Sequence, residues 1–300
     1  MGYSTSATSR RFFLLGLAGA AAAGAARAES PPKESAVRSA DARIAAIEAE
    51  AGGRLGVAVL DTASGAKLLH RADERFPMCS TFKLLAAAAA LKRVDEGKER
   101  LDRGIPYGAS DLLEYAPVAR QHVADGEMTL GELCAAALNW SDNTAANLIL
   151  AAIGGPEGFT AFVRSLGDET TRLDRNEPTL NEAAPGDPRD TTTPIAMAED
   201  LRTLLLGEAL SEASRRQLET WLVADKVGDK RLRAGLPASW RIGDKTGSGD
   251  HGTANTVGII RPPGRAPLIA AVYLTESAKP AEARNAAHKA VAEAIVEAFG

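Results

Sequence analysis

Strand-like segments occur near the two ends of this chain, and a long stretch with mainly helical patterns separates them. Residues 55–61 and 67–71 alternate like strands around a turn at 62–65, which predicts a β-hairpin. Further strand patterns occur at 241–245, 256–261 and 268–274. Strands that follow one another through short turns favour antiparallel pairing. We therefore expect an α/β (α+β) fold, in which both chain ends build a five-stranded antiparallel sheet with flanking helices and an inserted all-helical domain.

The segments around the strands indicate where helices and domains lie. Helical patterns cover residues 35–51, 80 to about 167, 194–206, 211–224 and 280 to about 299. The stretch 172–190 is polar, lacks periodicity and is longer than most connections, which is typical of a functional loop. We expect an α/β domain from 29–75 and 225–300, a helical domain from 76–224, and an active site between them.

The first 28 residues resemble an export signal. Ser9-Arg10-Arg11-Phe12-Phe13 precedes a Gly/Ala/Leu-rich stretch, and Ala26-Arg27-Ala28 has the A-x-A pattern of a cleavage site. A membrane anchor is the alternative, but the apolar run is short for a bilayer span and ends at the cleavage pattern. We predict a twin-arginine signal peptide at 1–28 and a periplasmic or secreted protein with no membrane segment after signal removal.

Composition narrows the class of partner. Of 300 residues, 45% are hydrophobic and 25% charged, so the chain can bury a sizeable core. The net charge is only -4, and no basic surplus indicates binding to nucleic acid or to an anionic lipid surface. We expect a small-molecule substrate, and a monomer because no exposed apolar repeat favours association.

Cys79 and Cys134 are the two cysteines. An exported protein could join them in a disulfide. However, both lie at or in apparent helices, and twin-arginine substrates fold in a reducing compartment before export. We therefore predict two free, buried thiols.

Three short motifs carry the chemistry. Ser80-Thr81-Phe82-Lys83 alone is weak evidence, because such a pattern occurs by chance and could be a helix N-cap serine followed by a surface lysine. Ser141-Asp142-Asn143 stands between two helical patterns, and Lys245-Thr246-Gly247 lies on a predicted strand. Together and in this order, the three are the motif set of class A β-lactamases and penicillin-binding proteins.

The first two motifs supply a nucleophile and proton carriers. Ser80 would be the nucleophile, and Lys83, three residues later on the same helix face, could be the base in contact with it if its surroundings lower its pKa. Ser141 could relay a proton to the leaving nitrogen. Asn143 could hold a substrate amide.

The third motif would form the opposite wall of the site. The backbone N–H groups of Ser80, at a helix start, and of Ser248 would make an oxyanion hole. Lys245 would supply positive charge for a substrate carboxylate, with the hydroxyls of Thr246 and Ser248 as donors. Gly247 would leave room for the substrate along the strand edge.

The polar loop distinguishes hydrolysis from acylation alone. It contains Arg175-Asn176-Glu177-Pro178-Thr179-Leu180-Asn181, in which a carboxylate and an amide four residues apart can share one water. Glu177 would be the general base that drives this water onto the acyl-enzyme, and Asn181 would orient it. An isolated loop glutamate would usually be a solvated surface charge.

With these motifs the chain resembles a class A serine β-lactamase from about residue 35 to the C-terminus. The resemblance implies an Ω-loop at 175–190, clamped by a salt bridge between Arg175 and Asp190, and a cis bond between Glu177 and Pro178. It also implies that Tyr115 is the aromatic residue at the entrance of the site, with a packing role as the alternative.

One departure from the family concerns the substrate carboxylate. Many members carry an arginine on the strand after K-T-G that pairs with this group, and Ala254 occupies the matching position here. The resemblance implies that Arg231 takes that role instead. The alternative is a surface arginine on a loop.

Another departure concerns disulfides. One family disulfide would pair Cys134 with the position of Ala87, and another, frequent in carbapenem-hydrolysing members, would pair Cys79 with the position of Gly249. Neither partner is a cysteine, which favours free thiols. Cys79 together with Ser248-Gly249-Asp250 resembles the branch that hydrolyses extended-spectrum cephalosporins.

The expected function is hydrolysis of the β-lactam ring of penicillins and cephalosporins through an acyl-Ser80 intermediate, which gives antibiotic resistance. Lys83 and Glu177 both remain candidates for the acylation base. A DD-peptidase, or a β-lactam-sensing penicillin-binding domain that acylates without turnover, is the alternative. No cofactor or metal is expected, because the histidines lack the spacing of a hydrolytic zinc site. These histidines are His70, His122, His251 and His288.

Overall fold

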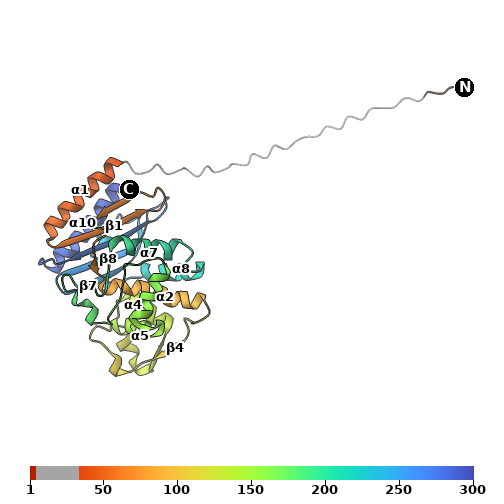
Figure 1. Cartoon of the computed structure of the whole chain (residues 1–300). Coiled ribbons are helices and arrows are strands. Elements are labelled where there is room, and N and C mark those ends of the chain that lie inside the picture. Colours follow the sequence, from red (N-terminus) through yellow and green to blue (C-terminus); the bar gives the residue numbers. More distant parts are fainter. Residues whose placement is uncertain (5–33) are drawn as a thin grey trace.

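Figure 1 shows the computed structural model of the chain, which describes residues 1–4 and 34–300. The twin-arginine segment and the cleavage pattern lie outside the described residues. Within 34–300 no single helix is long and apolar enough to cross a bilayer. The helices α5 (Asn143–Ile153) and α6 (Gly155–Ser165), bent by 70° between them, reach that length and composition only as a pair.

The sheet has five antiparallel strands in the order β2-β1-β9-β8-β7, which confirms the prediction of a sheet built from both chain ends. The strands are β1 (Arg54–Asp61), β2 (Lys67–His70), β7 (Arg241–Gly249), β8 (Thr253–Arg261) and β9 (Leu268–Thr275). Strand β7 includes the K-T-G motif, as predicted, and residues 246–249 pair with β8 although they lack apolar alternation. The K-T-G motif therefore lies within a strand at the edge of the sheet.

Helices cover both faces of the sheet, as Figure 1 shows. Strands β1, β8 and β9 are accordingly buried along nearly their whole length instead of at alternate residues. Helices α1 (Glu34–Ala51) and α10 (Ala281–Phe299) pack together on one face. The core there includes Ile44, Leu55, Val272 and Ile295.

On the other face, α7 (Pro194–Leu206) packs against β1 and β9. Helix α2 (Phe82–Asp95) lies among the remaining helices and is buried continuously from Phe82 to Leu91. Its alanines let neighbouring elements approach closely, and Phe82 stacks edge-on against Phe159 at 6.2 Å between ring centroids. One hydrophobic cluster extends from Ala58 and Tyr273 on the sheet to these helices, so sheet and helices share a core.

The helical stretch predicted from residue 80 to about 167 is interrupted. Strands β4 (Gly104–Pro106) and β5 (Glu127–Thr129) form an antiparallel pair within it, and residues 107–118 are largely irregular. Pro106 and Pro117 lack a backbone N–H, which disfavours a continuous helix there. The other helices and 3-10 turns are η2 (Ala109–Asp111), α3 (Ala119–His122), η3 (Val123–Asp125), α4 (Leu130–Asn139), α8 (Glu212–Val223) and α9 (Leu232–Gly235).

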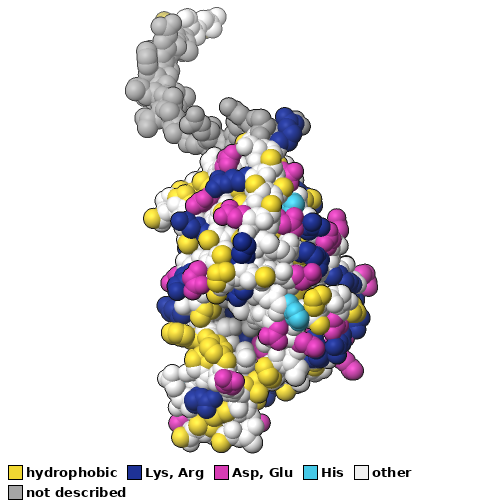
Figure 2. Space-filling view, turned by 90° about the vertical axis from the view of Figure 1, so that its left-hand side faces the viewer, with side chains coloured by type: hydrophobic (Ala, Val, Ile, Leu, Met, Phe, Trp, Pro, Cys, Tyr) yellow, Lys and Arg dark blue, Asp and Glu magenta, His cyan; other side chains and the backbone are white. Residues whose placement is uncertain are grey.

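A small strand pair brings the end of the polar loop beside the segment that contains Ser80. Strand β3 (Phe76–Pro77) pairs with β6 (Thr191–Thr192) just before the 3-10 turn η1 (Cys79–Thr81), which leads into α2. The loop 172–190 contains only the short 3-10 turn η4 (Thr179–Glu182), as its lack of periodicity predicts. On the face drawn in Figure 2, basic and acidic side chains are interspersed.

Candidate active site

Ser80 lies in a buried turn whose backbone is strained. The preceding residue, Cys79, has a φ of 45°, in the left-handed region that costs a non-glycine residue roughly 1 kcal/mol or more. Ser80 is only 7% exposed, yet it lines a cavity of about 290 Å³. The turn therefore presents a hydroxyl to the cavity while the rest of the segment stays packed.

The Lys83 amine is completely buried and has polar partners on three sides. Its Nζ donates to Asn143 Oδ1 at 2.6 Å and to the backbone oxygen of Ser141 at 2.8 Å, and it lies 2.9 Å from Glu177 Oε1. Burial lowers the pKa of Lys83, although the Glu177 carboxylate acts in the opposite direction. Lys83 is thus a buried, networked amine, whereas an isolated S-x-x-K motif could equally have placed it at the surface.

The expected direct contact between Ser80 and Lys83 is replaced by a link through Glu177. Ser80 Oγ donates to Glu177 Oε1 at 3.2 Å, and the same oxygen contacts the lysine amine. Helix geometry predicts that residues three apart share a face. It does not predict that a carboxylate 97 positions away in the chain contacts both groups.

Ser141 connects the two lysines of the motifs. Its Oγ accepts from Lys83 Nζ at 3.4 Å and from Lys245 Nζ at 3.1 Å. Its backbone φ is 58°, a left-handed conformation outside any helix. Burial, together with the positive charge of Lys83, lowers the pKa of Lys245 to about 7. The site can therefore hold a hydroxyl between two amines of reduced basicity.

Asp142 explains why Ser141 keeps this conformation. The buried Asp142 carboxylate caps α5 by accepting from Ala145 N, and its other oxygen accepts from Val118 N and Ala119 N, each at 2.9 Å. It thereby ties the start of α5 to the loop that carries Tyr115. The position of Asp142 before a helical pattern is an N-cap signal, although no function is predicted for this residue.

Gly247 has a packing role in addition to the one predicted. A side-chain carbon at this position would lie 2.8 Å from the backbone oxygen of Met78, 3.2 Å from Thr81 Cγ2 and 3.3 Å from the backbone nitrogen of Ser80. The glycine therefore lets β7 pack closely against the turn that contains Ser80. Its role in leaving room for substrate along the strand edge stays a prediction.

Arg231 lies against the K-T-G strand and is only partly exposed. Its guanidinium donates to the backbone oxygens of Gly247 and Asn255 and to Ser248 Oγ, each at 2.7 Å. Burial lowers the pKa of Arg231 to about 10. Ala254 pairs with Ser248 across the two strands, so Arg231 occupies the neighbourhood of the arginine that Ala254 replaces.

The Ω-loop (residues 175–190) has the predicted clamp. Arg175 Nε lies 2.6 Å from Asp190 Oδ2, and Asp190 Oδ1 also accepts from the backbone nitrogen of Arg175 at 2.9 Å. The Glu177-Pro178 peptide bond is cis. Both structural predictions for this loop are therefore confirmed.

A side chain from α5 fixes the position of Glu177. Asn147 accepts from the backbone nitrogen of Glu177 and donates to its backbone oxygen, both at 2.9 Å. On the loop itself, Asn181 Nδ2 donates to Glu177 Oε2 at 2.5 Å. The buried Asn181 Oδ1 has no hydrogen-bond partner among the described residues, so it can accept from a water. Asn147 could not be predicted from the sequence, because an asparagine within a helical pattern gives no signal of a backbone partner in another segment.

The predicted binding residues converge on the cavity. Its lining consists of Ser80, Tyr115, Ser141, Asn143, Asn181, Val227, Arg231, Thr246, Gly247 and Ser248. All except Val227 are predicted site residues, while Lys83, Glu177 and Lys245 contact members of this set from behind. Tyr115 is 49% exposed and donates to the backbone oxygen of Trp140, which places it at the rim.

The remaining sequence predictions concern thiols and metals. Cys79 and Cys134 are free and buried, as predicted. Among residues 1–4 and 34–300, no group of three histidine, cysteine, aspartate or glutamate side chains is arranged to hold a metal ion.

Comparison with known proteins assigns this chain to a family. Residues 39–299 match the Beta-lactamase enzyme family. The chain is 54% identical over 257 residues to β-lactamase CTX-M-8 of Citrobacter amalonaticus, covering 86% of this chain and 88% of that protein. It is 51% identical over 251 residues to β-lactamase OXY-2 of Klebsiella oxytoca, covering 84% and 86%.

Comparison with solved structures supports the same family. An ancestral (GNCA) class A β-lactamase superposes with a TM-score of 0.86 at 66% identity, covering 87% of this chain and 100% of that one. The five-stranded antiparallel sheet and the helices on both its faces are thus the fold of that class. The chain belongs to the class A serine β-lactamases, enzymes that hydrolyse the β-lactam ring and so confer antibiotic resistance.

Proposed function

We propose that this β-lactamase works through an acyl-Ser80 intermediate, which is cleared by a water that Glu177 activates. The observation that carries the proposal is the position of the Glu177 carboxylate. One of its oxygens lies 3.2 Å from Ser80 Oγ, and the other lies 2.5 Å from the amide nitrogen of Asn181. A base in this position can act on the hydroxyl of the nucleophile or on a water beside the ester.

In acylation, Ser80 Oγ attacks the carbonyl carbon of the ring, the carbon–nitrogen bond breaks, and the nitrogen takes up a proton. The hydroxyl proton goes to Glu177 or, through it, to Lys83, and the contacts leave both routes open. Ser141 Oγ, held between Lys83 and Lys245, is the donor to the leaving nitrogen. Two amines beside this hydroxyl can replace the proton it gives away.

In deacylation, Glu177 takes a proton from water as the water oxygen attacks the ester carbon, and Ser80 Oγ leaves with a proton. Asn181 holds the water through its unpartnered Oδ1. The cleft excludes bulk solvent from Glu177, whose side chain is fully buried. A preorganised base needs little rearrangement at the moment of reaction.

The remaining lining residues bind the substrate. Lys245, Arg231 and the hydroxyls of Thr246 and Ser248 form a positively charged end for a carboxylate. The backbone N–H groups of Ser80 and Ser248 polarise the ring carbonyl. Asn143 holds a substrate amide and Tyr115 forms the rim, while Gly247 lets the two walls approach.

We further propose twin-arginine export to the periplasm or exterior, on the pattern at residues 9–28, and a monomeric enzyme of two domains, 29–75 with 225–300 and 76–224. Hydrolysis of extended-spectrum cephalosporins is part of this proposal, on the residues Cys79 and Ser248-Gly249-Asp250. The alternative of a DD-peptidase or a sensor domain has no support among the relatives, which are named β-lactamases.

Stopped-flow turnover of a chromogenic cephalosporin, followed by intact mass of the protein, tests the proposal. Sustained turnover with no adduct is expected, and Ser80→Ala should lose nearly all turnover. A single stoichiometric burst with a lasting adduct on the wild-type protein would instead favour a penicillin-binding or sensor protein.

A further inference from the structure

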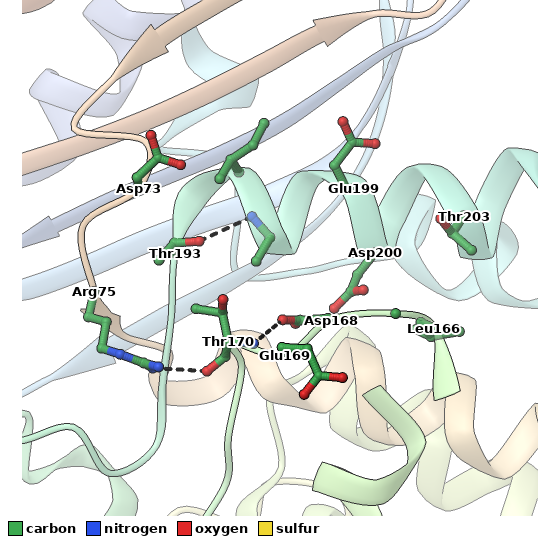
Figure 3. A pocket seen from close by; sticks show the side chains of 13 residues that line it. Asp73, Arg75, Leu166, Asp168, Glu169, Thr170, Thr193, Glu199, Asp200 and Thr203 are labelled. Carbon is green, nitrogen blue, oxygen red and sulfur yellow. Dashed lines mark hydrogen bonds between the residues drawn. The ribbon is translucent and has the colours of Figure 1, made fainter. Parts of the chain in front are cut away.

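A second cavity, of about 670 Å³, lies apart from the catalytic cleft, between α7 and the chain segment that leads toward the Ω-loop (Figure 3). Its charged lining residues are Asp73, Arg75, Asp168, Glu169, Glu199 and Asp200. Five carboxyl groups and one guanidinium thus surround this space. The proposed mechanism uses none of them.

Two of these carboxyl groups, Asp168 and Asp200, are buried and face each other (Figure 3). Asp168 is 9% exposed and Asp200 3% exposed. Each has a buried Oδ2 that receives no hydrogen bond from an N–H or O–H group of the described residues. The two groups are nevertheless within hydrogen-bonding reach of each other. Two carboxyl oxygens can make that bond only with a proton between them.

The backbone decides which side chain carries the proton. Asp168 Oδ1 already accepts from the backbone nitrogens of Thr170 and Thr171, at 2.6 and 3.0 Å. These donors favour negative charge on Asp168, so the proton belongs to Asp200. Burial and the facing Asp168 raise the pKa of Asp200 to about 9, while Arg164 opposes this shift.

Further titratable and charged groups surround the Asp168–Asp200 pair, on each of the elements that pack against it. They are Arg164 on α6, Glu169 beside Asp168, Glu199 on α7, Asp73 and Arg75 before β3, and Tyr273 on β9. Arg75 donates instead to Thr170 O and Thr191 Oγ1, and Glu199 accepts from Lys67 and Arg202. Asp73 and Glu169 add negative charge, which further favours a protonated Asp200, whereas the charge of Glu199 is already paired with Lys67 and Arg202.

The pair joins the two chain segments that flank the Ω-loop. Asp168 precedes the loop, and Asp200 lies on α7, which follows it. Between them, Thr171 Oγ1 and Thr192 Oγ1 are 2.6 Å apart, and the backbone nitrogen of Arg172 donates to Thr191 O at 3.0 Å. These contacts hold together the two segments that flank the loop of Glu177.

We propose that Asp168 and Asp200 share one proton and form a positioning pair, which anchors both ends of the Ω-loop and keeps Glu177 in place until that proton is lost at alkaline pH. The inference rests on the proposed role of Glu177 in deacylation. Loss of the proton places two negative charges together in a buried site, and their repulsion separates α7 from the start of the loop.

The test replaces Asp200 with a donor that does not titrate. In Asp200→Asn, the amide can donate to Asp168 at every pH. The matched control is Glu199→Gln, which removes a neighbouring carboxylate that pairs with Lys67 and Arg202 at the surface. If Asp200→Asn does not fold, Asp200→Ser offers a hydroxyl donor for the same comparison.

The first readout is kcat against pH, with intact mass to detect acyl-enzyme. For wild type and Glu199→Gln, kcat should fall about fivefold from pH 9 to pH 10, as loss of one proton requires, and acyl-enzyme should accumulate. Asp200→Asn should keep its kcat over this interval. An alkaline fall of the same size in Asp200→Asn would overturn the positioning role.

The second readout is Tm against pH, which does not depend on the role of Glu177. The pKa of Asp200 is higher in the folded protein than its ordinary value of 3.8, so its stabilising effect is full below about pH 4 and declines as pH rises to about 9. The Tm of Asp200→Asn relative to wild type should therefore rise by about 2 °C per pH unit over this range and then level off. A constant difference would overturn the shared proton. A sloping difference combined with turnover by Glu177→Ala would mean that the proposed function, and not the pair, is wrong.

Discussion

Asn147 is predicted to control deacylation although it does not touch the substrate cavity. Asn147→Ala removes both hydrogen bonds to the backbone of Glu177, each 2.9 Å long. It leaves a partly buried N–H and C=O without their partner, at a cost of roughly 1 to 2 kcal/mol each. The expected loss of unfolding free energy is therefore about 2 to 4 kcal/mol, or a fall in Tm of about 4 to 7 °C.

The kinetic effect should be specific to the second chemical step. When the backbone of Glu177 is no longer fixed, its carboxylate loses alignment with the water, so kcat should fall more than tenfold while acyl-enzyme accumulates. Asn147→Asp is the matched variant, because it can still accept from the nitrogen of Glu177 but opposes its carbonyl oxygen with a carboxylate. Intact mass after mixing with a cephalosporin, alongside thermal unfolding, measures both effects. Wild-type Tm and turnover in Asn147→Ala would refute the reasoning.

Three further predictions follow from the site. Arg231→Ala should raise KM for substrates with a carboxylate about tenfold in steady-state kinetics, because it removes the positive charge beside Ser248. An unchanged KM would mean that Arg231 does not bind the substrate carboxylate. The pKa of Lys245 is lowered to about 7, so its positive charge is present below that pH and lost above it. For substrates with a carboxylate, kcat/KM should therefore fall as pH rises through about 7. A kcat/KM that does not change with pH would contradict this. Burial raises the pKa of Cys134 to about 12 and also raises that of Cys79, so a thiol reagent at neutral pH should label neither cysteine in the native protein and both after unfolding.

The sequence predicts elements whose signals are local. The hairpin, the later strands and helices α1, α7 and α10 carry apolar periodicity, and the structure confirms all of them to within a few residues. The motifs likewise predict residues that the structure brings together around one cavity. The K-T-G motif is also predicted to lie on a strand, and its pairing with β8 confirms this.

Contacts between distant segments could not be predicted in this way. Nothing local indicates that Glu177 lies between Ser80 and Lys83, or that Asn147 binds the backbone of Glu177. These contacts depend on how the Ω-loop closes against α2 and α5. Asp200 stands beside Glu199 in sequence and would be taken for another surface acid, yet it is buried against a second carboxyl group.

At Gly247 the structure adds a packing role that the sequence does not indicate. The sequence suggests space for substrate, and the structure shows in addition that the glycine lets β7 pack closely against the turn that contains Ser80. Similarly, the S-x-x-K spacing suggests a direct pair of hydroxyl and amine, and a third residue joins them instead.

The proposed role of Glu177 is tested most directly by the intact mass of Glu177→Ala after rapid mixing with a chromogenic cephalosporin, with wild type as the control. We expect a lasting adduct on Ser80 in the variant, because the water that clears the acyl-enzyme has lost its base, and free protein after turnover in wild type. Sustained turnover by Glu177→Ala at the wild-type rate, with no adduct, would contradict it.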